Sequence, residues 1–394
     1  MKTRWLRLSA AVVLLISLGL IYAWSVFVSP LEAEFGWVRA QTTMTFTVVM
    51  SCFCLGCLGG GFITAKKSPR LALMLSAVLL FSGFILASRV STLMGLYLSY
   101  GVCIGFGVGL SYNVLINITS RWFPDRKGLA SGIMLMGFGL GSMLLSSTAT
   151  AMMKSIGWRQ TFMLFGLIFG GLIALGGLTV AKPPQDFAPP VPEKAAGAFQ
   201  GLNLPPLKVL QRPSFWLFYF FSIMLTSSGL VVIGHAATAA MDLQANQSTA
   251  ALSVGVFSIC NGLGRILFGL IFDRLEVSKA LRVALIPTGL GGALLTVAIL
   301  QGSLPLLFIG FAFAGFSYGA IANYNSSYPA AFYGMENFGL NFSLMTSNIL
   351  FSSVLGPYVA AALRDATGTY AASFLAILIM GLAAGVASLF IRKP

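Results

Sequence analysis

Twelve long apolar runs divide this chain, and they restrict its fold more than any other feature of the sequence. Each run is at least 20 residues long, which is about the length that a helix needs to cross the hydrocarbon core of a bilayer. A helix in lipid satisfies its own backbone hydrogen bonds, so the runs predict membrane-spanning helices. The runs are 8–31, 41–64, 70–89, 93–119, 128–153, 159–181, 214–240, 248–272, 280–300, 304–330, 338–363 and 369–391.

The composition agrees with a surface that faces lipid. Only 9% of the residues are charged and 57% are hydrophobic, whereas a soluble domain carries about 25% charged residues. We therefore expect an all-α polytopic membrane protein with twelve transmembrane helices. The five cysteines lie inside apolar runs without a histidine pattern, which indicates packing residues rather than metal ligands. No metal and no cofactor is expected.

One long polar stretch, 182–213, separates the sixth run from the seventh. It begins KPPQDFAPPVPEK, and such prolines with mixed charges are typical of a linker. The sequence thus predicts an N-terminal six-helix bundle at 1–181, a cytoplasmic linker at 182–213 and a C-terminal six-helix bundle at 214–394.

The two predicted bundles are related by an internal repeat. A shift of 208 residues aligns the segment that follows the first run with the segment that contains GRILFGLIFDR, without a gap. In this register Gly61 matches Gly269, Ala65 matches Asp273 and Lys66 matches Arg274. Parallel repeats of six helices are the architecture of a large class of transporters, which bind their substrate near the middle of the membrane between the repeats.

The distribution of Lys and Arg predicts the orientation in the membrane. When the loops are assigned alternately to two faces, eighteen of the 24 basic residues lie on the face of the termini, five lie on the other, and Arg265 belongs to neither. Basic residues concentrate on the cytoplasmic side, so both termini are predicted to be cytoplasmic. The net charge of +14 is then a topological signal and does not indicate nucleic-acid binding. The first run is too long for a signal peptide, and we expect a multi-pass protein of the cell inner membrane.

Two loop sequences resemble motifs of a known protein family. GLIFDR, which contains Asp273 and Arg274, resembles the gating motif G-x-L-x-D-R of the major facilitator superfamily, and RWFPDRKGLASG is also typical of that superfamily. With the twelve runs and the central linker, the resemblance covers the whole chain and implies the same two-bundle fold. The matching loop of the first half, GFITAKKSPR, has Ala65 where the family has Asp, so its usual gating salt bridge is not expected.

Three further stretches are similar to the oxalate/formate antiporter and monocarboxylate transporter branch of that superfamily. They are SYNVLINITSRWFPDRKG, NGLGRILFG and ENFGLNFSLMTSN. The resemblance implies that the arginine of G-R-x-x-x-G, here Arg265, binds the anion.

Arg265 is also singled out by its position alone. It lies eight residues before Asp273, about 12 Å along a helix from the cytoplasmic end, where an arginine costs roughly 2.5–3.5 kcal/mol. No Asp or Glu lies at a comparable depth in any run. The guanidinium could hold two carboxylate oxygens of a substrate, or a buried ion pair could hold helices together. A buried arginine without a buried acid favours the first alternative, in which the ligand supplies the negative charge.

Two asparagines bear on the kind of anion. Asn261 lies one turn before Arg265, and animal monocarboxylate transporters have an aspartate there that takes part in proton coupling, so that route is absent here. Asn348 stands where oxalate transporters have a lysine that helps to neutralise a second carboxylate. With one cation in place of two, the sequence favours a monoanion.

Other polar residues of the runs are candidates to line the site, and packing or helix–helix hydrogen bonding is the alternative for each. Tyr112 and Asn117 are in the fourth run, Tyr318 is in the tenth and Tyr22 is in the first. His235 is the only histidine, and since histidine titrates near neutral pH, it is a candidate for proton coupling. A hydrogen-bonded packing role is the alternative for it.

These features predict a secondary active transporter of small monocarboxylates such as lactate or pyruvate. It would be proton-coupled and would work by alternating access with Arg265 as the carboxylate anchor. The alternative is an oxalate/formate-type or other dicarboxylate exchanger. No cluster of acids, histidines or metal ligands indicates a membrane enzyme, so no catalytic residue is predicted. The expected partners are a small organic monoanion, a co-transported proton and the lipid bilayer, and we expect a monomer.

Overall fold

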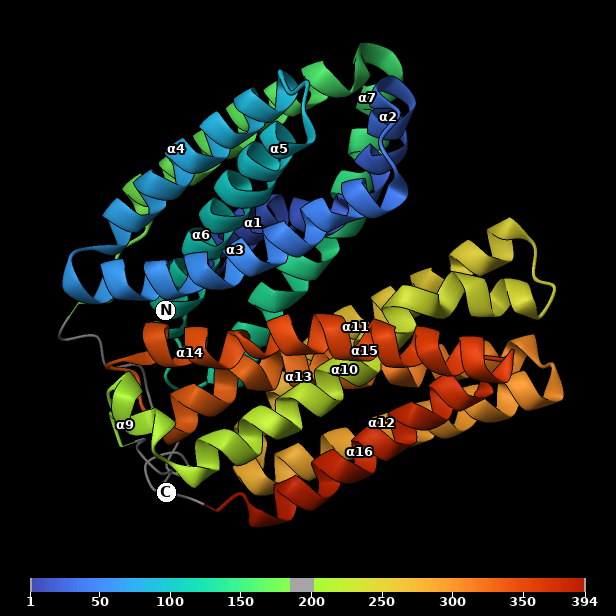
Figure 1. Ribbon diagram of the computed structural model, residues 1–394. Coiled ribbons are helices and arrows are strands. Elements are labelled where there is room, and N and C mark those ends of the chain that lie inside the picture. The colour runs from blue at the N-terminus through green and yellow to red at the C-terminus, as the bar shows by residue number, and fades with distance from the viewer. Residues whose placement is uncertain (1, 185–201, 393–394) are drawn as a thin grey trace. The chain divides into compact units, whose positions relative to one another are not determined.

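A computed structural model describes residues 2–184 and 202–392, and helices make up nearly all of this part of the chain (Figure 1). The helices α1 to α7 are Lys2–Leu18, Ser25–Phe35, Arg39–Lys66, Pro69–Ser88, Leu93–Leu96, Gly105–Ser120 and Lys127–Thr179, with a 3-10 turn η1 at Gly19–Ala23 and a π-helical segment η2 at Tyr97–Ile104. The helices α9 to α16 are Pro206–Leu210, Pro213–Asp242, Gln247–Arg274, Val277–Gln301, Leu304–Phe332, Phe338–Thr346, Asn348–Thr367 and Ala371–Phe390.

The helices confirm the predicted fold class. Eleven segments of the described residues are long and apolar enough to cross a membrane. The longest is α7, whose 53 residues would extend about 80 Å as one helix, far beyond a bilayer core of about 30 Å. Gly157 interrupts it with a non-helical backbone, φ 78° and ψ 164°. The interruption separates α7 into the two spans that the sequence predicts at 128–153 and 159–181, so the described chain provides twelve.

Residues 185–201, most of the predicted linker and including Lys194, lie outside the described residues. The remainder of the linker contains the short helix α9, which begins after Pro205. Just before it, the amides of Leu202 and Leu204 donate to the carbonyl oxygens of Phe332 and Tyr333. This end of the linker is thereby fixed to the end of α13.

The chain forms two compact units that do not follow the chain order throughout. Unit 1 comprises Met1–Asp125, Gly137–Ala198 and Asn337–Thr346, and unit 2 comprises Arg126–Met136, Phe199–Glu336 and Ser347–Pro394. The first turns of α7 therefore belong to unit 2, and α14 belongs to unit 1. The predicted division into bundles at 1–181 and 214–394 stays a prediction.

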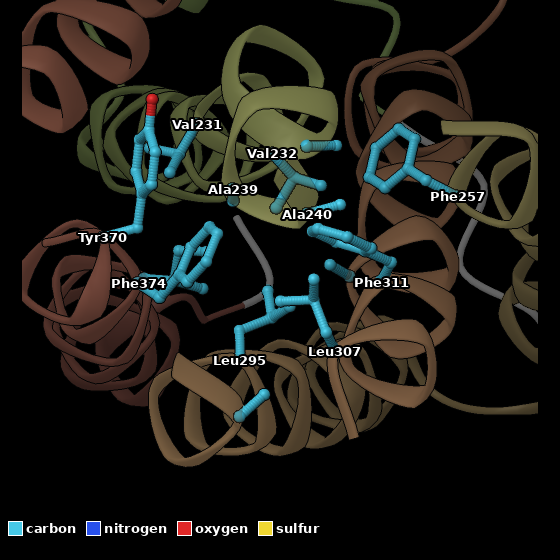
Figure 2. Packing of buried hydrophobic residues seen from close by; sticks show 14 of the residues in the cluster. Val231, Val232, Ala239, Ala240, Phe257, Leu295, Leu307, Phe311, Tyr370 and Phe374 are labelled. Atoms are coloured by element: carbon cyan, nitrogen blue, oxygen red, sulfur yellow. The ribbon is translucent and has the colours of Figure 1, made fainter. Parts of the chain in front are cut away.

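The core of unit 2 is apolar and aromatic (Figure 2). Val232 and Ala239 of α10, Leu295 of α12, Phe311 of α13 and Phe374 of α16 belong to this cluster, and all five side chains are buried. The helices α12 and α16 lie side by side (Figure 1). Because lipid tails are as apolar as these side chains, close packing and not exclusion from water holds such helices together.

Unit 1 depends on a close approach of α1 and α7 at glycine. A Cβ on Gly141 would overlap the carbonyl oxygen of Ile16, and Gly19 lies against the Cα of Gly141. Gly171, further along α7, has open space where a Cβ would be. Gly141 thus serves helix packing, as small residues do at membrane helix interfaces.

Gly141→Ala should lower the free energy of unfolding by about 1–3 kcal/mol, because α1 and α7 would have to separate. Gly171→Ala is the matched control. It adds the same methyl group to the same helix in open space and should leave stability equal or raise it by about 0.5–1 kcal/mol. Thermal unfolding of both variants in detergent measures the difference, and equal melting temperatures would show that the crossing tolerates a methyl group.

Candidate functional site

Arg265 is buried in α11, with 7% of its surface exposed. Its Nε donates to Oδ1 of Asn261, one turn earlier, at 3.3 Å, and its Nη1 donates to the backbone carbonyl of Leu135. All three residues belong to unit 2. Two of the five N–H groups of the guanidinium are thus occupied by neutral acceptors. These acceptors orient the guanidinium but do not neutralise its charge.

Backbone contacts fix the position of Arg265 from two sides. A Cβ on Gly132, at the start of α7, would overlap the carbonyl oxygen of Arg265. A Cβ on Gly319 of α13 would overlap the carbonyl oxygen of Asn261 and lie too close to the amide nitrogen of Arg265. Asn323 of α13 joins the two contacts, since its Nδ2 donates to the carbonyl oxygens of Gly128 at 2.9 Å and of Arg265 at 3.2 Å.

No carboxylate in the described part of the chain forms an ion pair with Arg265. Several acids pair with other bases: Asp125 with Arg4, Glu34 with Arg159, Asp242 with Arg364 and Glu276 with Lys279. At Glu34, the hydrogen bond from Arg159 holds the pKa of the carboxyl below its ordinary value. The charge of Arg265 is therefore not balanced by an acid of residues 2–184 and 202–392.

Three further predicted residues lie in unit 2. Tyr318 immediately precedes Gly319, and its ring covers Gly229 of α10. Asn348 is fully buried at the start of α15, where its carbonyl accepts a hydrogen bond from Ser352 at 2.9 Å. His235 is half-buried in α10, with Nε2 at 3.4 Å from the carbonyl oxygen of Pro357.

The ring of His235 also contacts a tyrosine hydroxyl. Its Nδ1 lies 3.4 Å from the hydroxyl of Tyr370, which is bonded in turn to Thr238 at 2.9 Å. Both ring nitrogens thus have neutral protein partners within unit 2, which fits the hydrogen-bonded packing alternative.

Unit 1 holds Tyr22, Tyr112 and Asn117. The ring of Phe138 lies between the two tyrosines, with centroid distances of 5.4 Å to Tyr22 and 4.8 Å to Tyr112. Asn117 accepts a hydrogen bond from Nε of Arg121 at 3.2 Å, and its amide lies against Gly339 of α14. These contacts unite the tyrosines in one aromatic cluster and place Asn117 at a helix crossing of the same unit.

In the gating motif, Asp273 and Arg274 have different surroundings. The carboxylate of Asp273 accepts hydrogen bonds from the amides of Gly128 at 2.7 Å and Leu129 at 2.9 Å, at the start of α7. A carboxylate at a helix N-terminus satisfies free amides and opposes the helix dipole favourably. Arg274 is exposed.

Sequence reasoning misses Leu135 beside Arg265, because its contribution is a backbone carbonyl, which residue identity does not reveal. It also misses Phe138 beside the tyrosines of unit 1, because it is one of many phenylalanines in apolar runs. Asn323 is recognisable in the sequence as a polar residue of the tenth run, and as a buried amide it must find partners. No group of His, Cys, Asp or Glu suited to a metal occurs among the described residues.

Comparison with known proteins identifies the family of this chain. The family model described as Major Facilitator Superfamily matches residues 10–238 and 218–394. The chain is 27% identical over 345 residues to an uncharacterized transporter of this type, YhjX of Escherichia coli, covering 87% of this chain and 84% of the relative. It is 27% identical over 364 residues to the oxalate:formate antiporter of Oxalobacter formigenes, covering 91% and 85%. Human monocarboxylate transporter 11 is 29% identical over 324 residues, covering 80% and 67%.

Solved structures share the fold. The Escherichia coli fucose:proton symporter FucP superposes with a TM-score of 0.69 at 14% identity, covering 97% of this chain and 98% of its own. The proton:xylose symporter XylE gives a TM-score of 0.68 at 15% identity, covering 99% and 96%. At these identities the likeness concerns the fold alone.

Asp273→Asn should loosen the start of α7, because an amide retains one acceptor but loses the charge that strengthens both hydrogen bonds. The backbone amides of Gly128 and Leu129 should exchange with deuterium about tenfold faster, as the loss of a charge-assisted bond implies. Mass spectrometry of peptides covering 126–136 in the full-length protein measures this. The control is Asp365→Asn, which removes another exposed carboxylate and should leave the exchange of 126–136 unchanged.

Proposed function

Because the chain belongs to the major facilitator superfamily, we propose that it is a secondary active transporter of small monocarboxylates such as lactate and pyruvate. Arg265 anchors the carboxylate, transport proceeds by alternating access, and a proton crosses with the substrate. The protein lies in the inner membrane with both termini in the cytoplasm. The observation that carries the proposal is a buried guanidinium without an acidic partner among the described residues.

The hydrogen bonds of Arg265 support a carboxylate ligand. Asn261 and Leu135 take one N–H each, which leaves three of the five donors of the guanidinium for a ligand. A carboxylate that accepts two of them also neutralises the charge, and such bidentate pairs are short and strong. A sugar hydroxyl would satisfy the donors but would leave the charge unbalanced, which disfavours a neutral substrate.

Asn348 supports a monoanion. It is neutral and fully buried, and it stands where the resemblance to oxalate transporters implies a lysine for a second carboxylate. A dianion at Arg265 would therefore carry one charge into the protein without a second cation to balance it. Uncompensated buried charge is costly, so the proposal favours substrates with a single carboxylate.

The chain's neutral residues support co-transport of the proton on the substrate itself. Asn261 cannot accept a proton as an aspartate would, and His235 is bonded to Pro357 and Tyr370. When the substrate carboxylate carries the proton, Arg265 faces a neutral acid, which it holds less tightly than the anion. Proton uptake by the substrate therefore favours release.

The oxalate:formate antiporter of Oxalobacter formigenes supports a second candidate, exchange of a dicarboxylate for a monocarboxylate. Arg265 would serve this activity equally well, because one of the two carboxylates would bind it. The two candidates differ in which counter-substrate drives uptake. Monocarboxylate transport responds to a proton gradient, whereas exchange requires a loaded anion on the opposite side.

Arg265→Gln should reduce uptake of radiolabelled L-lactate into proteoliposomes by roughly a hundredfold, the loss expected for two charge-assisted hydrogen bonds. Arg282→Gln is the control, since Arg282 is an exposed arginine bonded to a neighbouring carbonyl, and it should transport like the wild type. Uptake is measured with and without an inward proton gradient, and then with oxalate or formate loaded inside. Wild-type protein that ignores lactate and pyruvate but exchanges oxalate would replace the first candidate with the second.

His235→Gln should leave the stimulation of lactate uptake by the proton gradient unchanged, because the substrate and not the histidine carries the proton. The quantity to compare is the ratio of initial rates with and without the gradient, in wild type and variant. A ratio that drops to one in the variant, with uptake itself retained, would assign the coupling to His235.

A further inference from the structure

Unit 1 contains a cavity of about 300 Å³ outside the candidate site. It lies where the beginning of α1, the end of α6 and the end of α7 meet, and its surface is mainly apolar. Its lining includes Leu6, Arg7, Ala10, Ile118, Trp122 and Thr179.

The cavity has a buried floor and an exposed apolar rim. Ile118 and Trp122 form the floor, with 1% and 5% of their surfaces exposed. Leu6, on the rim, is 72% exposed, and Ala10 one turn later is exposed as well. Since α1 and α7 are membrane-spanning segments, a rim of this composition suits acyl chains better than water.

One cation lines the cavity, and it is held in place without an acid. Nη1 of Arg7 donates to the carbonyl oxygen of Thr179 at 3.0 Å, and its guanidinium lies 4.6 Å from the ring centroid of Trp122. Trp122 is fixed in turn by the hydrogen bond from its indole N–H to the carbonyl of Ala181 at 3.0 Å. Nε of Arg7 is buried and has no hydrogen-bond partner in the described residues. The arginine is therefore oriented with a donor unsatisfied.

We propose that this cavity binds one anionic phospholipid, with its phosphate at Arg7 and part of an acyl chain along Leu6, Ala10 and Ile118. A phosphate oxygen accepts from the guanidinium N–H groups of Arg7 that Thr179 leaves unoccupied and balances the charge, while the chain fills the apolar part of the cavity. The sequence assigns Arg7 to the predicted face with eighteen of the 24 basic residues, and basic residues near a membrane surface attract anionic lipids. The bound lipid joins the ends of α1, α6 and α7.

Native mass spectrometry of the full-length protein in detergent tests the site with phosphatidylglycerol and with phosphatidylcholine of the same acyl chains. Wild-type protein should retain phosphatidylglycerol in preference to phosphatidylcholine. Arg7→Gln should bind phosphatidylglycerol about tenfold more weakly, as the loss of a charged hydrogen bond implies. Lys67→Gln, which removes an exposed basic residue that does not line the cavity, should bind it like the wild type.

A second variant separates lipid binding from the structural role of Arg7, which also bonds to Thr179. Ala10→Trp keeps Arg7 but fills the rim, and it should abolish the preference for phosphatidylglycerol while melting like lipid-free wild type. Equal retention of both lipids by wild type would overturn the proposal, as would full phosphatidylglycerol binding by Arg7→Gln. Displacement of phosphatidylglycerol by millimolar inorganic phosphate would show a phosphate site and overturn the assignment to lipid. None of these variants changes Arg265.

Discussion

The close approach of helix backbones at glycine is the constraint on which the surroundings of Arg265 depend. Gly132 lets the start of α7 touch the carbonyl of Arg265, and Gly319 lets α13 touch the turn between Asn261 and Arg265. Beside these contacts, the carbonyl of Leu135 accepts a hydrogen bond from the guanidinium. Membrane helices have no hydrophobic driving force toward one another, so contacts of this kind both hold the helices and bury the charge.

A charge buried in this way has consequences for the empty protein. Carbonyl and amide oxygens lower the cost of burying a guanidinium, but an unpaired ion in a medium of low polarity remains costly. A ligand that brings the opposite charge therefore changes the electrostatic energy of the site more than any rearrangement of neutral groups can. A loaded carrier should then pass between its conformations more readily than an empty one, which is the behaviour expected of an exchanger or of anion and proton co-transport.

Local patterns in the sequence predict the spans and single out Arg265. Contacts between backbone groups that are distant in the sequence cannot be predicted in this way. Length and hydropathy predict two runs at 128–153 and 159–181, and Gly157 marks the break between them. A lone arginine in an apolar run is also recognisable in the sequence. The hydrogen bond from Arg265 to the carbonyl of Leu135 cannot be predicted, because every residue has a carbonyl and only the packing of α7 on α11 selects this one. The same limit hides Phe138, whose role depends on two tyrosines distant in sequence.

The internal repeat predicts two equivalent helix crossings, and the contacts show how one substitution makes them unequal. Gly269 meets Gly128 in unit 2 as Gly61 meets Gly339 in unit 1. A buried asparagine donates to the crossing glycine's carbonyl in both units, Asn323 to Gly128 and Asn113 to Gly339. The crossing in unit 2 has the carboxylate of Asp273 on its helix N-terminus, whereas the repeat places Ala65 at the matching position of unit 1. Charge-assisted bonds are roughly twice as strong as neutral ones, and the side chain of Ala65 supplies none, so the bonds of Asn113 to Gly339 and Ser343 in unit 1 are neutral.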